Sequence, residues 1–177
     1  MTIIKTSPIG SFSMAAIIAA SLLIGCNKPD PWQVSHIQTK LTPFRSSRLV
    51  YNSEDKVNGI DIEFIADSSE NHVYLKVHSH PFKPYQGKKK QALVTISDEA
   101  LVNQFICIRH QGGQKITLTE EARDFMIERL MLGNKVYISC SGYSVDVSSE
   151  NFESKFASFL SPPKSYIKIQ SPLHSLK

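Results

Sequence analysis

From about residue 47 to residue 118, apolar and polar side chains alternate with a period of two. In one segment Ile60, Ile62 and Phe64 face one way, and the acidic residues between them face the other way. Because successive side chains of a β-strand point to opposite faces, this alternation predicts strands that each bury one face. Further alternating or apolar runs are residues 73–78, 93–96, 105–108 and 115–118. The middle of the chain is therefore predicted to form an antiparallel sheet.

The period changes to helical spacing after residue 118. Thr119 is a favourable N-cap, and acidic residues follow it in the first turn, where the helix dipole favours them. Gly133 suits the C-terminal end, because glycine adopts the left-handed conformation without a steric cost. These signals predict a helix over about residues 120–132.

A hairpin and a second short helix follow the first helix. The two strands of the hairpin are predicted at residues 135–140 and 143–147. The second helix is predicted over about 150–160 from a stripe of aromatic residues, Phe152, Phe156 and Phe159. Strands followed by helices predict an α+β fold, mainly an antiparallel β sheet or sandwich with two short helices.

The N-terminus carries a pattern of its own. The run from Met14 to Ile24 has 11 residues, and none is more polar than Ser21. At about 1.5 Å per residue, it covers roughly half of a 30 Å hydrocarbon core. A short apolar run after a basic residue, here Lys5, is typical of a secretory signal peptide. We therefore expect residues 1–25 to be a signal peptide and not a membrane span.

The motif Leu23-Ile24-Gly25-Cys26 ends this apolar run and resembles the lipobox of bacterial lipoproteins. The resemblance implies cleavage between Gly25 and Cys26, with diacylglycerol on the Cys26 thiol and an acyl chain on its new amine. Several acyl chains, at about 0.8 kcal/mol per buried methylene, anchor a protein far better than one chain does. The implied partner is a membrane, reached through this lipid, and no other cofactor is expected.

The residues after the cysteine bear on location and on domain boundaries. Asn27 and Lys28 follow Cys26 where an Asp would favour retention in the inner membrane of enteric bacteria, so the outer membrane is favoured over the inner. Residues 26–46 are predicted to be a lipidated flexible tether, because their first residues have turn-forming composition without an apolar period. The globular domain is then predicted at 47–160, and 161–177 is a tail or adds one strand at Tyr166–Ile169.

Charge limits the classes of partner. Removal of residues 1–25 takes away one lysine and no acid, so the net charge falls from +4 to +3 on the remaining 177 − 25 = 152 residues. This length suits one domain with a core. The run Lys88-Lys89-Lys90 could touch anionic lipid or nucleic acid, but no aromatic platform accompanies it. We therefore predict a solvated turn there and no nucleic-acid partner.

Two cysteines remain after lipidation of the first. Cys140 shares a strand face with Val136 and Ile138 and should point into the core, whereas the direction of Cys107 is open. In an oxidising compartment the pair Cys107 and Cys140 is a candidate disulfide that would add about 3–4 kcal/mol of stability. The alternative is two small buried thiols.

The best candidate for a metal site is His78-Ser79-His80. In an extended segment His78 and His80 would project to the same face and could bind one metal ion. A third ligand would have to come from elsewhere, with His110 as one candidate. The alternative is that the pair ends a strand and faces water. The row formed by Tyr74, Lys76 and His78 on the polar strand face is a second candidate binding surface, although ordinary sheet surfaces look the same.

Catalytic motifs do not appear in the sequence. We find no G-x-S-x-G elbow, phosphate-binding glycine loop, H-E-x-x-H or C-x-x-C motif. The leading hypothesis is therefore an envelope lipoprotein with a non-catalytic interaction or structural domain that works through envelope proteins. A metal- or small-ligand-binding lipoprotein using His78 and His80 is the alternative, and an envelope hydrolase is the third.

A second, more limited resemblance supports an envelope role. The order of strand, Gly-Gly turn, strand, helix, hairpin and helix over residues 106–159 is similar to periplasmic β-sandwich proteins of the invasion-associated locus B type. This similarity covers about a third of the chain and rests on the order of elements. It implies an envelope-associated protein and no particular chemistry.

Overall fold

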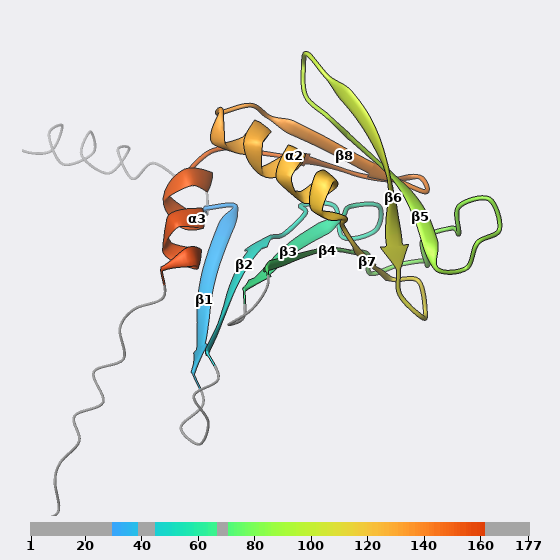
Figure 1. The fold of residues 1–177 in the computed structure, drawn as a ribbon, viewed down its shortest axis with the longest axis horizontal. Coiled ribbons are helices and arrows are strands. Elements are labelled where there is room, and N and C mark those ends of the chain that lie inside the picture. The colour runs from blue at the N-terminus through green and yellow to red at the C-terminus, as the bar shows by residue number, and fades with distance from the viewer. Residues whose placement is uncertain (1–29, 39–44, 67–70, 162–177) are drawn as a thin grey trace, which may run out of the picture.

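A computed structural model describes residues 30–38, 45–66 and 71–161. Within these residues nine strands form one antiparallel sheet, and two helices accompany it (Figure 1). The strands are β1 (Trp32–Gln38), β2 (Arg45–Tyr51), β3 (Asp61–Ala66), β4 (Asn71–Lys76), β5 (Gln91–Ser97), β6 (Val102–Arg109), β7 (Lys115–Thr117), β8 (Val136–Cys140) and β9 (Tyr143–Val147). The helices are α2 (Glu120–Met131) and α3 (Phe152–Leu160). The α+β prediction, with its mainly antiparallel sheet, is confirmed.

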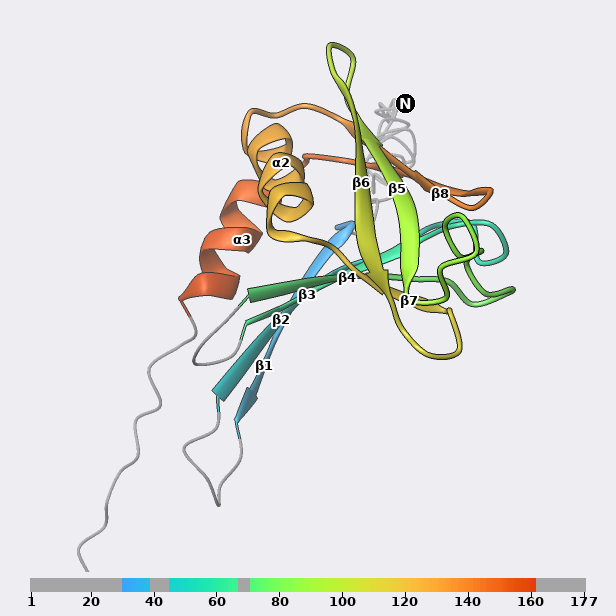
Figure 2. The same cartoon turned by 45° about the vertical axis from the view of Figure 1, so that its right-hand side comes forward.

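The sheet consists of two parts joined by the short strand β7. The spatial order is β1-β2-β3-β4-β7-β6-β5-β8-β9, so β7 pairs with β4 on one side and with β6 on the other. Figures 1 and 2 show that β5 and β6 cross the direction of β1–β4 steeply, so the sheet is strongly curved. Both helices lie on its inner side (Figures 1 and 2).

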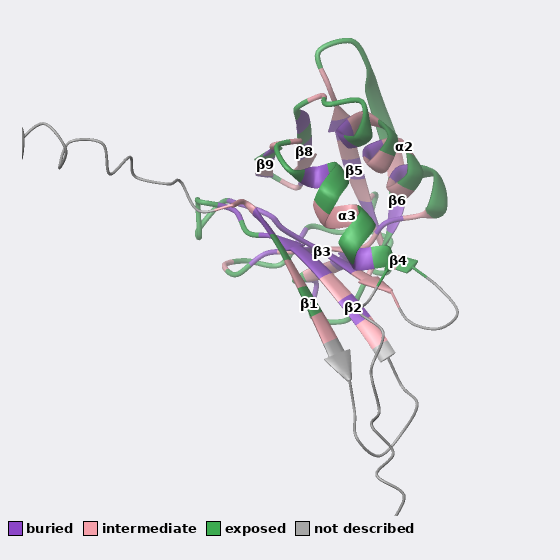
Figure 3. Ribbon diagram, turned by 90° about the vertical axis from the view of Figure 1, so that its left-hand side faces the viewer, coloured by how far each residue is buried: buried purple, intermediate pink, exposed green. Residues whose placement is uncertain are grey.

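The core lies between the inner side of the sheet and the two helices. Helix α2 buries Ala122, Met126 and Leu130, and α3 buries Phe152 and Phe159. Figure 3 shows buried stretches of β2 and β3 beside α3. The predicted helical stripes are therefore core-packing features, as their spacing suggested.

The helix boundaries also follow the predicted signals. Thr119 caps α2, since its hydroxyl oxygen accepts a hydrogen bond from the Ala122 N–H at 3.4 Å. Gly133 follows the helix with φ +83°, a conformation that glycine adopts without strain. Both helices match the predicted ranges within two residues.

The predicted flexible tether over 26–46 is wrong for its described part. Residues 32–38 form β1 and pair with β2 in register from Trp32 opposite Tyr51. The Trp32 side chain is 0% exposed, and its indole N–H donates to the Ser148 carbonyl at 2.8 Å. The turn-forming residues before Trp32 led to the prediction of a tether. The strand is recognised only from its pairing with β2. Residues 26–29, 39–44 and 162–177, with the alternative strand at Tyr166–Ile169, lie outside the described residues.

Candidate functional site

The outer face of the sheet carries the polar residues of the predicted alternation. Glu63 on β3 is 5% exposed and makes ion pairs with Arg48 on β2 and Lys76 on β4. Burial raises the pKa of Glu63, but hydrogen bonds and the positive charges of Lys76 and Arg48 outweigh it and hold the pKa below its usual value. Glu63 is therefore a buried anion neutralised by two cations.

The predicted row of Tyr74, Lys76 and His78 lies on this face, but its side chains contact neighbours within the chain. The Lys115 ammonium lies 3.4 Å from the centre of the Tyr74 ring, which is a cation–π contact. Lys76 contacts Glu63, and the His78 Nε2 lies 2.6 Å from the Asp61 carboxylate. These contacts stabilise the sheet and leave the row less available to a ligand than the sequence suggested.

The geometric basis of the predicted metal pair does not hold. Strand β4 ends at Lys76, and residues 78–80 form a bend, so His78 and His80 do not share the face of an extended strand. His78 contacts Asp61, and the backbone of His80 exchanges two hydrogen bonds with the Tyr143 hydroxyl, at 2.7 and 2.8 Å. In the described part of the chain, no group of three or more His, Cys, Asp and Glu side chains is placed to hold a metal ion. Metal binding at His78 and His80 stays a prediction.

Cys107 and Cys140 are free buried thiols, which contradicts the predicted disulfide. Strand β5 lies between their strands β6 and β8, which places the strands roughly 10 Å apart at about 4.8 Å per neighbour. A disulfide needs α-carbons within about 7 Å. Burial is the main cause that raises the pKa of Cys107 to about 11, and burial also raises the pKa of Cys140. Both thiols are therefore protonated at neutral pH.

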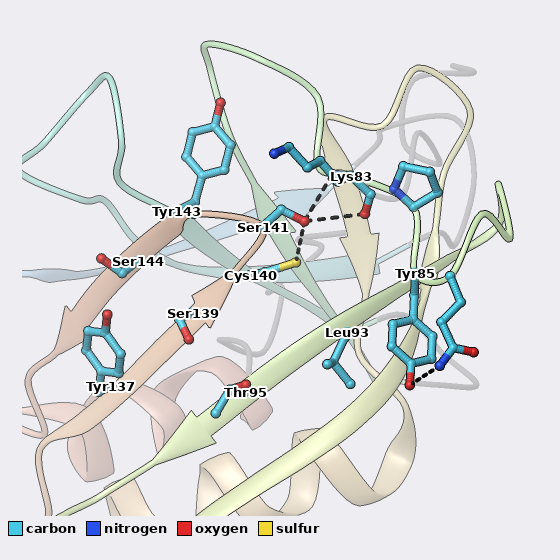
Figure 4. A pocket seen from close by; sticks show the side chains of 13 residues that line it. Lys83, Tyr85, Leu93, Thr95, Tyr137, Ser139, Cys140, Ser141, Tyr143 and Ser144 are labelled. Atoms are coloured by element: carbon cyan, nitrogen blue, oxygen red, sulfur yellow. Dashed lines mark hydrogen bonds between the residues drawn. The ribbon is translucent and has the colours of Figure 1, made fainter.

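One hollow on the outer face is lined by hydroxyl groups and tyrosine rings (Figure 4). It has a volume of about 480 Å³. Its floor is a row of hydroxyls on three neighbouring strands, because Thr95 on β5 pairs with Ser139 on β8, which pairs with Ser144 on β9. Tyr85 and Tyr137 line the same hollow. We call the set Tyr85, Thr95, Tyr137, Ser139 and Ser144 the hydroxyl groove.

The hydroxyl groove has unused hydrogen-bonding groups and is lined by a single charged side chain. Within the described residues, the side-chain hydroxyls of Thr95, Ser139 and Ser144 have no hydrogen-bond partner, and Lys83 is the one charged side chain that lines the groove. Cys140 also lines the groove, but no histidine does. Burial raises the pKa of the Cys140 thiol, whereas a nucleophilic thiol needs a lowered pKa. The groove is therefore suited to hydrogen bonding and ring stacking, not to thiol catalysis.

A second hollow, of about 670 Å³, is lined by three cationic side chains and a histidine at the end of the sheet. Lys89, Lys90, Arg109 and His110 line it, and Pro84 lines both this hollow and the hydroxyl groove. The Arg109 guanidinium is held in place because it donates to the carbonyls of Phe82 and Lys89, at 2.7 and 3.0 Å. The predicted solvated turn at Lys88-Lys89-Lys90 is confirmed, since all three residues are exposed, Lys89 and Lys90 lie in a turn, and Lys88 forms the bridge to Tyr85 that precedes it.

Most of the chain from β4 to β7 lacks acidic residues. Residues 71–97 and 100–119 contain no Asp or Glu, although they form β4 to β7 and their connections. We call their outermost part the basic end and define it by six cations, Lys83, Lys88, Lys89, Lys90, Arg109 and Lys115. Residues 26–177 carry a net charge of +3. Since these six cations contribute +6, the other residues of 26–177 carry a net charge of −3. Within the described residues, no carboxylate makes an ion pair with any of the six.

Sequence reasoning had noticed the lysine run but neither hollow. The hydroxyl groove requires that β5, β8 and β9 lie side by side, although Thr95 and Ser144 are far apart in sequence. The absence of acids over 71–97 and 100–119 was visible in the sequence and could have indicated the basic end. Cys26 and the lipobox lie outside the described residues. Among those residues, no helix is long and apolar enough to span a membrane.

Comparison with known proteins adds no family to this description. No protein-family model matches the chain, and neither a curated protein nor a solved structure matches it significantly. The resemblances to bacterial lipoproteins and to the invasion-associated locus B type therefore stay predictions.

Proposed function

We propose that the chain is a bacterial envelope lipoprotein, held to a membrane by acyl groups on Cys26, whose folded domain is a non-catalytic binding module. The observation that carries the proposal is the motif Leu23-Ile24-Gly25-Cys26 directly after an 11-residue apolar run. An apolar segment of this length followed by Gly and Cys suits a signal peptide that ends in a lipidation site.

The position of the first described residues supports an anchor at one end of the domain. Cys26 and Asp30 are four residues apart, so an extended chain spans at most about 14 Å between them. The Asp30 carboxylate lies 3.0 Å from the Lys155 ammonium on α3 and also contacts Asn151. An anchor on Cys26 would therefore hold the α3 end of the domain close to the membrane.

The binding role is supported by the two hollows at the opposite end. In Figure 1 the start of β1 lies beside α3, whereas the loop over 77–90 and the hairpin between β6 and β7 lie at the far side. An anchor at the α3 end would direct the basic end away from the membrane. The hydroxyl groove and the basic end suit a ligand better than His78 and His80 do. Among the described residues, the hydroxyls of Thr95, Ser139 and Ser144 have no partner and no carboxylate pairs with the basic-end cations, whereas His78 contacts Asp61.

Intact mass spectrometry of protein extracted from membranes with detergent tests this proposal. The wild-type protein is expected to begin at Cys26 and to carry the mass of diacylglycerol and one further acyl chain. The variant Cys26→Ala is expected to lose both acylation and membrane association. A wild-type chain that is unmodified, or that still carries residues 1–25, would contradict the proposal. Separation of inner and outer membranes by density would then test which membrane holds the acylated protein.

A further inference from the structure

We propose that the hydroxyl groove and the basic end together bind an acidic glycan, and that this glycan is peptidoglycan. The chemistry of the two hollows supports the ligand class by itself. The choice of peptidoglycan rests on the proposed function, because it uses the direction in which an anchor on Cys26 would turn the domain.

The hydroxyl groove has the groups that recognise sugar rings. Thr95, Ser139 and Ser144 offer a row of hydroxyls that can both donate and accept hydrogen bonds, as sugar hydroxyls do. Tyr137 is 43% exposed. Tyr85 lies across the groove from Tyr137, with Leu93 and Thr95 between the two rings (Figure 4). An exposed aromatic ring beside a row of hydroxyls fits the apolar C–H face of a sugar and its polar rim.

The basic end has the groups that recognise anions on such a polymer. Lys89, Lys90, Arg109 and His110 line one hollow, and no acidic residue lines it. Lysines and a guanidinium with no carboxylate beside them favour carboxylates or phosphates as partners.

The two hollows are neighbours, which favours one ligand over two. Pro84 lines both of them, and the segment over 83–90 runs between them. A small sugar would occupy the hydroxyl groove alone, and a small anion would occupy the basic hollow alone. A polymer whose sugar rings carry acidic substituents can fill both at once, and each contact then raises the effective concentration of the other.

The orientation of the domain selects the source of the acidic glycan. The α3 end, at Asp30, is within about 14 Å of Cys26 along the chain, whereas the basic end lies at the far side (Figure 1). The basic end would therefore face away from the anchoring membrane and its anionic lipids. Peptidoglycan is an acidic glycan that lies off the membrane in a bacterial envelope, and it has amide-bearing sugars and carboxylates on its peptide stems.

Co-sedimentation with purified peptidoglycan sacculi tests this proposal, using the full mature protein in detergent. Wild-type protein is expected to sediment with sacculi, and more strongly at low salt because exposed charges are then less screened. The double variant K89Q/K90Q is expected to bind about two- to thirtyfold more weakly, as for the loss of two exposed charge pairs. The variant Y137A is expected to bind about two- to tenfold more weakly, as for a lost aromatic contact.

Matched controls separate a local site from bulk charge and from misfolding. K135Q/K155Q removes the same charge at residues away from the basic end, because Lys135 precedes β8 and Lys155 lies on α3. It is expected to bind sacculi as wild type does. Circular dichroism melting of each variant checks the fold, and K89Q/K90Q changes exposed turn residues that the core does not use.

Three results would overturn the proposal. The first is a folded wild-type protein that does not sediment with sacculi. The second is an equal loss of binding in K135Q/K155Q and K89Q/K90Q, which would indicate bulk charge alone. The third is equally tight binding to phosphatidylglycerol vesicles with no effect of Y137A, which would indicate a lipid surface. The vesicle measurement uses the unacylated variant Cys26→Ala, because acyl chains would insert into vesicles by themselves. Failure of the anchor at Cys26 would appear separately in the mass of the wild-type preparation.

Discussion

Trp32 gives the sharpest test of where the domain begins. It is the only tryptophan in the chain, and it lies in a stretch whose composition predicts a flexible tether. In the structure its ring is 0% exposed and lies 4.9 Å from the ring centres of both Tyr51 and Phe152. The change Trp32→Ala therefore separates a packed first strand from a tether.

The structure sets the expected size of the effect. Truncation of a buried tryptophan to alanine costs about 3–5 kcal/mol, because apolar contacts are lost and a cavity remains. The Ser148 carbonyl also loses the indole N–H that it accepts at 2.8 Å, which contributes about 1 kcal/mol to this cost. At a urea dependence of about 2 kcal/mol per M, the midpoint of unfolding should fall by roughly 1.5–2.5 M.

Urea unfolding followed by circular dichroism measures this shift, using the chain from residue 26 with Cys26→Ala to prevent acylation. Before mutation, emission of the single tryptophan should be blue-shifted and resistant to quenching by iodide. Val57→Ala is the matched control, since Val57 is 61% exposed and its truncation should change stability by less than about 0.5 kcal/mol. Tryptophan emission typical of water, together with equal midpoints for Trp32→Ala and Val57→Ala, would refute the packed β1 strand.

Two further predictions concern buried titratable groups. Because the pKa of Glu63 is lower in the folded protein than its ordinary value of 4.5, its carboxylate stabilises the fold above that value, and this contribution is lost as the pH falls through the folded-state pKa. Glu63→Gln should thus be less stable than wild type at pH 7, by about 1–3 kcal/mol. As the pH falls below about 5, the free energy of unfolding of this variant should decrease less than that of wild type. Parallel curves of unfolding free energy against pH, measured with urea, would contradict this. Cys107 and Cys140 should resist iodoacetamide at pH 8 in the native protein and react after unfolding, since burial raises the pKa of Cys107 to about 11. A mass increase of about two daltons on reduction of the native protein would instead show a disulfide between them.

The accuracy of the sequence predictions follows from how local each signal is. The helix at Glu120–Met131 was predictable because its cap, its acidic first turn and its apolar spacing all lie within 15 residues of one another. The inward direction of Cys140 was equally predictable, because it shares strand parity with Val136 and Ile138. The strand at Trp32–Gln38 was missed because its signal is its pairing with β2, and a pairing partner is not visible in a local window.

The same reasoning explains why the geometry at the candidate sites differs from the expected one. A disulfide between Cys107 and Cys140 is plausible from composition, but the order of the sheet inserts β5 between their strands. A metal pair at His78 and His80 assumes that β4 continues past Lys76, where the chain instead bends toward Tyr143. In both cases a contact between elements distant in sequence decided the outcome.

The sequence by itself determined the strand periodicity, the two helices, the net charge and the expectation of a lipid anchor at Cys26. These are properties of neighbouring residues, so the covalent order of the chain suffices to read them. Only the tertiary structure decided that Thr95, Ser139 and Ser144 form one row and that Lys89, Lys90 and Arg109 line one hollow. The physical reason is that burial of apolar side chains on a curved sheet selects one strand order among many, and that order places distant residues side by side.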